Sequence, residues 1–195
     1  MNVKNKITVE FEMKGLGTMH YFLGLEVWQF PDEIFLNQGK YIVEFLKRFG
    51  MLYCKEINTP MVTNMKLLND DSLERVDVTL YRQIIGSLMY LKNTRRDICF
   101  VVNTLSQYMV EPRHVHLVAA KHVMRYLKGT LDCGLRYTAD SEFTLCGYTD
   151  SDWVGSVENR KSTSRYCFSL GLGVISWIRR KETSFPSVQK RLSTL

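Results

Sequence analysis

The middle of the chain carries apolar residues at the spacing of amphipathic helices. Between residues 40 and 49 they recur every three to four positions until a glycine ends the run, which predicts a helix. Residues 81–92 and 98–109 repeat the pattern and predict two more. A fourth helix is predicted over residues 112–128, with its proline at the first helical position and Gly129 just beyond its end.

Short apolar and β-branched runs in the first and last parts of the chain predict strands. Residues 21–30 and 34–36 flank a Pro-Asp-Glu turn and predict a hairpin. The C-terminal part predicts antiparallel strands over residues 134–137, 143–149, 164–170 and 173–178. Helices and antiparallel strands in separate stretches predict the α+β class.

Composition narrows the class of protein. Of the 195 residues, 45% are hydrophobic, which is enough for a packed core and argues against wholesale disorder. The net charge of +6 favours an anionic partner, although many soluble enzymes are also mildly basic. The five cysteines are scattered without a C-x-x-C pair, which suits a reducing compartment. No secretory leader and no run of about 18 apolar residues is visible, so an intracellular protein without a membrane partner is predicted.

One face of the helix predicted over residues 112–128 is basic. His114, Lys121, Arg125 and Lys128 gather there at helical spacing. This face is either a solvated surface or a set of contacts for the phosphates of a nucleic acid, which need aligned cations. His114 and His116 diverge by about 200° around the helix and cannot share a metal ion, so packing or surface roles are predicted for the histidines.

Short motifs follow one another along nearly the whole chain. They are Glu10–Gly17, Tyr21–Glu26, Gln38–Ile42, Arg48–Met51, Asn58–Met61, Tyr81–Leu91, Thr94–Asp97, Ala119–Lys121, Arg125–Thr130, Gly147–Gly155, Arg160–Phe168 and Val174–Trp177. Each motif alone is weak. In this order and spacing, however, the chain resembles the Pol polyprotein of Ty1/copia-type retrotransposons, from the C-terminal part of reverse transcriptase to the start of ribonuclease H.

The resemblance implies an architecture in four parts. It assigns residues 1–60 to the end of the reverse-transcriptase palm, with a primer-grip-like hairpin and the first thumb helix. Residues 61–133 correspond to a helical thumb- or connection-like region. Residues 134–182 correspond to a truncated ribonuclease H-like antiparallel β-meander, and residues 183–195 form a divergent tail.

The resemblance also implies contacts with nucleic acid. The hairpin residues similar to the primer grip are Phe22, Leu23, Gly24, Leu25 and Glu26. Together with the basic helix face, they would hold an RNA:DNA hybrid or a template–primer duplex. From the residue pattern alone, an ordinary core hairpin is the simpler interpretation.

Asp150 is the residue that resembles a catalytic carboxylate of the family, the first one of ribonuclease H. A two-metal nuclease needs several converging carboxylates, and the sequence after Glu182 departs from the family. Asp150 is therefore predicted to be vestigial, a weak and incomplete Mg²⁺ site. Mg²⁺ serves the intact family, and no functional cofactor is expected here. Asp70 and Asp71 are an adjacent acidic pair but lack the Tyr-x-Asp-Asp motif of the polymerase site, which is expected before residue 1. They are therefore interpreted as a chance resemblance to that motif and not as a metal site.

The sequence thus predicts a fragment of a retrotransposon reverse transcriptase/ribonuclease H polyprotein. The ancestral role is RNA-directed DNA synthesis and RNA-strand degradation during transposition. The fragment itself is predicted to be catalytically inactive, to bind nucleic acid at most and to take no small-molecule substrate. The alternative is a recruited, non-enzymatic interaction or effector-like protein on the same fold, although neither a signal peptide nor an Arg-x-Leu-Arg motif is present.

Overall fold

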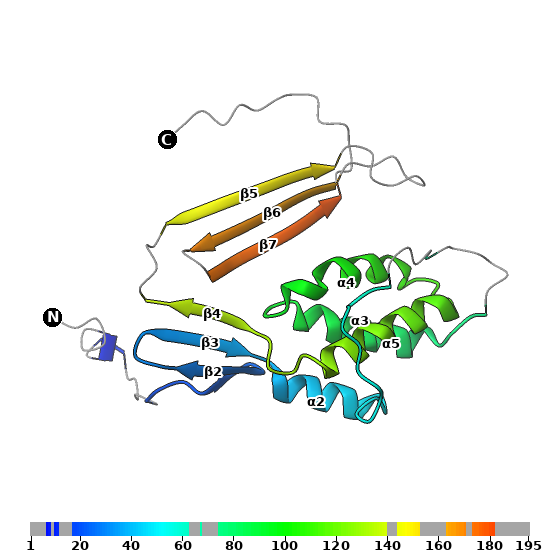
Figure 1. The fold of residues 1–195 in the computed structure, drawn as a ribbon, viewed down its shortest axis with the longest axis horizontal. Coiled ribbons are helices and arrows are strands. Elements are labelled where there is room, and N and C mark those ends of the chain that lie inside the picture. Colours follow the sequence, from blue (N-terminus) through cyan, green and yellow to red (C-terminus); the bar gives the residue numbers. More distant parts are fainter. Residues whose placement is uncertain are drawn as a thin grey trace. The chain divides into compact units, whose positions relative to one another are not determined.

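The computed structural model divides the chain into two compact units (Figure 1). The first unit is Met1–Gly134 and the second is Leu135–Leu195. The residues that the structure describes are 7–8, 10–11, 17–62, 67, 74–139, 144–152, 163–170 and 173–181.

Antiparallel strands occupy residues 21–37 of the first unit. Strand β1 (Tyr21–Phe22) pairs with β2 (Leu25–Gln29), and β2 pairs with β3 (Glu33–Asn37). The predicted hairpin is confirmed by β2 and β3, but the single strand predicted over residues 21–30 is wrong, because the structure divides it into β1 and β2. Leu23 and Gly24 adopt φ of 47° and 76° and turn the chain back on itself. Two consecutive positive φ values are the geometry of a type I′ turn, whose twist matches that of the paired strands.

Helices follow the strands in the first unit. They are α2 (Gly39–Arg48), α3 (Val78–Leu91), α4 (Cys99–Leu105) between the 3-10 turns η1 (Arg96–Ile98) and η2 (Ser106–Tyr108), and α5 (His114–Lys128). The helices predicted from periodicity are confirmed, with the third tightened into 3-10 turns at both ends. The fourth begins later than predicted: Arg113 is its N-cap, so Pro112 lies outside it.

The four helices enclose the hydrophobic core of this unit. Its fully buried members come from every helix and include Ile42, Leu46, Ile85, Leu88, Val102, Leu105, Val123 and Leu127. Tyr81 is also fully buried, and its hydroxyl donates to the carbonyl oxygen of Leu105 at 2.8 Å. Among the described helices, none has the length and apolar character that crossing a membrane would demand.

The second unit is built from strands. β5 (Leu145–Asp152), β6 (Thr163–Leu170) and β7 (Gly173–Lys181) form an antiparallel sheet in that order. The preceding strand β4 (Leu135–Thr138) contacts β7, and its Tyr137 hydroxyl donates to the carbonyl oxygen of Val174 at 2.7 Å. The predicted mixture of helices and antiparallel strands is therefore confirmed as α+β. The finer assignments to a palm end and a ribonuclease H meander stay predictions.

Candidate nucleic-acid interface

The tip of the β1–β2 hairpin exposes large apolar side chains. Leu23 is 74% exposed, and Tyr21 and Phe22 are more than half exposed. Of the other predicted contact residues, Leu25 is half-buried and Glu26 is buried. The predicted set therefore contains an exposed tip and a more buried base.

A tyrosine from α3 supports the tip from below. The Tyr90 hydroxyl donates a hydrogen bond to the carbonyl oxygen of Leu23. A Cβ at Gly24 would lie 2.7 Å from the same hydroxyl oxygen, inside van der Waals contact. The Tyr90 ring also meets Tyr41 of α2 edge-on, with the ring centroids 4.8 Å apart. The positive φ of Gly24 and the approach of the Tyr90 hydroxyl both disfavour a side chain at this position.

Glu26 connects the hairpin to helix α2. Its Oε2 accepts a hydrogen bond from the Lys40 backbone N–H at 2.9 Å, and its Oε1 lies 3.4 Å from the Lys40 ammonium nitrogen. The first turn of α2 has no acidic residue of its own, so Glu26 supplies the negative charge that a helix N-terminus favours. The structure therefore places Glu26 as a helix cap beneath the tip.

The exposed face of α3 is a set of residues that the sequence reasoning missed. Arg82, Gln83, Gly86 and Met89 recur at helical spacing and are all exposed, with Tyr90 half-buried at their edge. We call these five residues the α3 face. It adjoins the hairpin tip through the contact between Tyr90 and Leu23.

Gly86 is the informative member of the α3 face. A glycine inside a helix costs about 1 kcal/mol relative to alanine. Among the described residues, nothing comes within 4 Å of the place a Cβ of Gly86 would occupy, apart from its own helix backbone. Packing therefore gives no reason for the glycine. A ligand that approaches the helix closely would be a reason for the glycine. In the sequence, the signal for this site is a glycine inside a helical pattern.

The predicted basic face of α5 is divided by its contacts. His114 and Lys121 are exposed. Arg125 donates from Nε to the Lys55 carbonyl oxygen at 2.7 Å. Lys128 donates from Nζ to the Cys54 carbonyl oxygen at 2.8 Å. The N-terminal half of the face is thus exposed, while the C-terminal half binds the chain's own backbone.

Two further contacts hold the same loop on α5. The Lys128 ammonium nitrogen lies 3.5 Å from Oε1 of Glu56, and Nε2 of His122 is 3.0 Å from the Thr59 carbonyl oxygen. Residues 54–59, which we call the α5 loop, therefore lie along the C-terminal half of the helix. His122 therefore contacts this loop through a ring nitrogen.

An ion pair between a buried arginine and a partly exposed aspartate joins two of the sequence motifs. Arg95 is 1% exposed, and its guanidinium binds Asp97 and the backbone and hydroxyl oxygens of Thr130. Burial alone would raise the pKa of Asp97, but its hydrogen bonds and ion pair with Arg95, and the Tyr126 hydroxyl, hold that pKa below its usual range. Arg95 is therefore a structural cation and is not available to a phosphate.

The remaining candidate residues form no metal centre within the part of the chain that the structure describes. His116 is fully buried and stacks on Tyr108 with ring centroids 3.8 Å apart. The backbone of Asp150 lies in β5 opposite Arg165, but its side chain, like Asp70 and Asp71, lies outside what the structure describes. Among the residues that are described, no three His, Cys, Asp or Glu side chains gather as metal ligands. The described side chains thus do not fit a two-metal centre, and no catalytic step is assigned to them.

Known proteins similar to this chain include retrovirus-related Pol polyproteins of transposons. Residues 1–63 match the family described as reverse transcriptase (RNA-dependent DNA polymerase). An uncharacterized mitochondrial protein of Arabidopsis thaliana is 38% identical over 178 residues, which cover 91% of this chain and 73% of that protein. The retrovirus-related Pol polyprotein from transposon RE1 of the same plant is 38% identical over 181 residues, covering 93% of this chain but 12% of the polyprotein.

A third relative carries a different kind of name. The secreted RxLR effector protein 161 of Plasmopara viticola is 43% identical over 103 residues, which cover 52% of this chain and 72% of that protein. No solved structure matches the chain.

Proposed function

Since the chain belongs to the Pol polyprotein family of copia-type retrotransposons, we propose that it holds a template–primer duplex or RNA:DNA hybrid for the reverse transcriptase of such an element. The chain spans 12% of the RE1 polyprotein. The proposal therefore concerns the holding of nucleic acid, and the reaction of a whole polyprotein is not assigned to this segment.

The observation that carries the proposal is Gly86 on the α3 face. The sugar–phosphate backbone of a duplex is broad, and it can approach a helix most closely where a side chain is missing. The α3 face offers such a place, flanked by the polar Gln83 and by Tyr90. The hairpin tip stands beside it, because Tyr90 holds Leu23. A duplex on the α3 face would thus also meet the exposed apolar tip, the part that resembles a primer grip.

Cations on α5 supply the sequence-independent attraction in this proposal. Phosphate contacts position a duplex and make its affinity depend on salt. Lys121 and His114 are exposed and can reach phosphates directly. Arg125 and Lys128 keep their positive charge while they bind the α5 loop, so they add to the local potential. Glu56 partly offsets that charge.

The same proposal includes binding without catalysis. Metal-dependent phosphoryl transfer needs several carboxylates around two ions. Asp150 is the residue whose sequence motif resembles one of them, and one carboxylate cannot hold two ions. The segment would then position nucleic acid for catalytic residues that lie elsewhere in a polyprotein.

A binding and cleavage assay tests both parts. The purified chain is titrated into a fluorescently labelled RNA:DNA hybrid at low and high salt, with Mg²⁺ present. We expect binding that weakens steeply with salt and a hybrid that stays intact. Failure to retain the hybrid at low salt would contradict the binding. Cleavage that disappears in the Asp150→Asn variant would contradict the lack of catalysis.

A second candidate function comes from the effector-like relative. The 43% identity over 103 residues allows the same fold to serve as a non-enzymatic interaction protein. This alternative predicts that the purified chain does not bind the hybrid at low salt. It also predicts that the chain forms a stoichiometric complex with one protein, and that this complex survives nuclease treatment. The binding assay therefore separates the two candidates before any partner is sought.

A further inference from the structure

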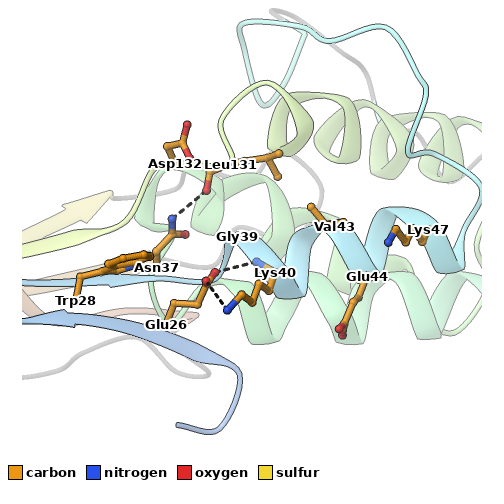
Figure 2. Close-up of a pocket in the computed structure, with 10 residues that line it drawn as sticks. All are labelled: Glu26, Trp28, Asn37, Gly39, Lys40, Val43, Glu44, Lys47, Leu131 and Asp132. Carbon is orange, nitrogen blue, oxygen red and sulfur yellow. Dashed lines mark hydrogen bonds and ion pairs between the residues drawn. The ribbon is translucent and has the colours of Figure 1, made fainter. Parts of the chain in front are cut away.

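A depression of about 470 Å³ lies between the hairpin and helix α2 (Figure 2). Strand residues line one side, helix residues line another, and the chain after α5 closes the third. The lining consists of Glu26, Trp28, Asn37, Gly39, Lys40, Val43, Glu44, Lys47, Leu131 and Asp132. This volume falls within the range of small-ligand sites, and the mixed lining does not belong to the hydrophobic core.

Trp28 provides the largest apolar surface of the depression. It is 54% exposed, although tryptophan side chains are on average largely buried. Side chains alternate between the faces of a strand, so Trp28 and Glu26 share one face of β2. Tyr21 pairs with Glu26 and stands on that face too, with the Lys40 ammonium 5.7 Å from its ring centroid. Two exposed aromatic rings and a cation therefore follow one another along one surface.

The rim carries charges of both signs, spaced along helix α2. Lys40, Glu44 and Lys47 project from this helix in Figure 2. Lys40 and Lys47 are seven residues apart, or about 10 Å along the axis. Glu26 is already paired with Lys40, which leaves Glu44 and Asp132 as the further carboxylates of the rim.

We propose that this depression binds one unpaired nucleotide of a single-stranded extension, adjacent to the duplex held elsewhere on the chain. The Trp28 ring stacks on the base, which is the usual means of holding single-stranded nucleic acid. Lys47 binds a flanking phosphate, and Lys40 and Tyr21 extend the path of the strand. Glu44 or Asp132 accepts a hydrogen bond from an exocyclic amino group of the base. The inference deepens the proposed function and rests on it for the duplex.

The charge pattern selects this ligand class. A duplex presents phosphates on its whole surface and would be repelled by the carboxylates of Glu44 and Asp132. A single nucleotide presents a flat apolar face, hydrogen-bond donors on the base edge and one phosphate. Those three features match, in turn, the Trp28 ring, the carboxylates and Lys47. Stacking tolerates any base, while the carboxylates favour adenine, guanine and cytosine, whose exocyclic amino groups can donate to them, over uracil and thymine.

Comparison of a blunt hybrid with a hybrid that carries a three-nucleotide overhang tests the stacking. We expect the overhang to strengthen binding about tenfold, since stacking on an aromatic side chain is the main added contact. Trp28→Ala should abolish that gain and leave blunt-hybrid binding unchanged, while Trp28→Phe should keep most of it. Phe30→Ala is the matched control, because Phe30 is 53% exposed but does not line the depression. Equal losses on blunt and extended hybrids in Trp28→Ala would overturn the proposal.

The role of Lys47 is tested in the same way, with the neighbouring Arg48 as the control. Lys47→Ala should reduce the gain from the overhang and flatten its salt dependence, whereas Arg48→Ala, one residue away and outside the lining, should not. Thermal unfolding of each variant verifies that the fold is kept.

A free oligonucleotide separates this inference from the proposed function. A single-stranded trinucleotide titrated into the chain should quench the fluorescence of Trp28, and the Trp28→Phe variant should lose that component of the signal. Quenching without any binding of the blunt hybrid would sink the proposed function and leave the nucleotide site standing. Binding of the blunt hybrid without quenching by the trinucleotide, and without a gain from the overhang, would sink the nucleotide site alone.

Discussion

Arg95 and Asp97 form a bidentate ion pair in the first unit. Nε of Arg95 lies 3.0 Å from Oδ1 of Asp97, and Nη2 lies 2.6 Å from Oδ2. The same guanidinium donates to the Thr130 carbonyl oxygen at 2.8 Å, and the Tyr126 hydroxyl donates to Asp97 at 2.7 Å. One partly buried network therefore joins the sequence motifs 94–97 and 125–130.

Removal of the carboxylate from this network should destabilise the fold. Asp97→Ala leaves the buried guanidinium of Arg95 without its counter-ion, and breaking such a pair costs about 3–5 kcal/mol when both partners are buried. Asp97 is 36% exposed, so we expect about 2 kcal/mol, measured by urea unfolding. Asp32→Ala, at an exposed carboxylate in the β2–β3 turn, should change stability by less than about 0.5 kcal/mol. Equal effects of the two substitutions would contradict a structural role for the pair.

The lowered pKa of Asp97 predicts a pH dependence of stability. A carboxyl whose pKa is lower in the folded state stabilises the fold fully above its unfolded pKa of about 3.9. That contribution is lost as the pH falls toward the folded pKa. The wild type should therefore lose more free energy of unfolding between pH 6 and pH 3 than Asp97→Asn does. Parallel stability profiles for the two proteins would contradict the shift.

Gly24 and Gly50 form a matched pair for testing the hairpin tip. Both have positive φ, 76° and 67°, but among the described residues only Gly24 has Tyr90 within reach of an added Cβ. Alanine in a left-handed conformation costs about 1–2 kcal/mol at either position. Gly24→Ala should cost more, because it also clashes with the Tyr90 hydroxyl, and Tyr90→Phe should relieve part of that excess. Equal losses of stability at the two glycines would show that Tyr90 does not support the tip.

The two halves of the α5 basic face should behave differently. Lys121→Ala should lower the slope of log affinity against log salt by about one and leave stability unchanged, because an exposed lysine gives up a phosphate contact only. Arg125→Ala should release the α5 loop and speed proteolysis within residues 54–59. An unchanged salt slope in Lys121→Ala would remove this residue from the proposed interface.

The helices and most strands were predictable, because their apolar spacing alone determines which faces are buried. The turn at Leu23 was not, since a leucine rarely adopts a positive φ and here does so beside a tyrosine 67 residues away. The sequence likewise could not reveal that Arg125 and Lys128 bind backbone carbonyls about 70 residues earlier in the chain. Charge shows in a sequence, but the partner of a charge depends on the tertiary fold.

Gly86→Ala offers the most direct test of the claim that the α3 face holds a nucleic-acid duplex. Alanine should stabilise helix α3 by about 0.5–1 kcal/mol, because nothing in the described structure occupies the space of its Cβ. The added methyl group should weaken binding of the blunt RNA:DNA hybrid about tenfold, since it intrudes on a close contact. Thr104→Ala on α4 controls for helix propensity away from this face. A Gly86→Ala variant that is more stable and binds the hybrid as tightly as the wild type would contradict the claim.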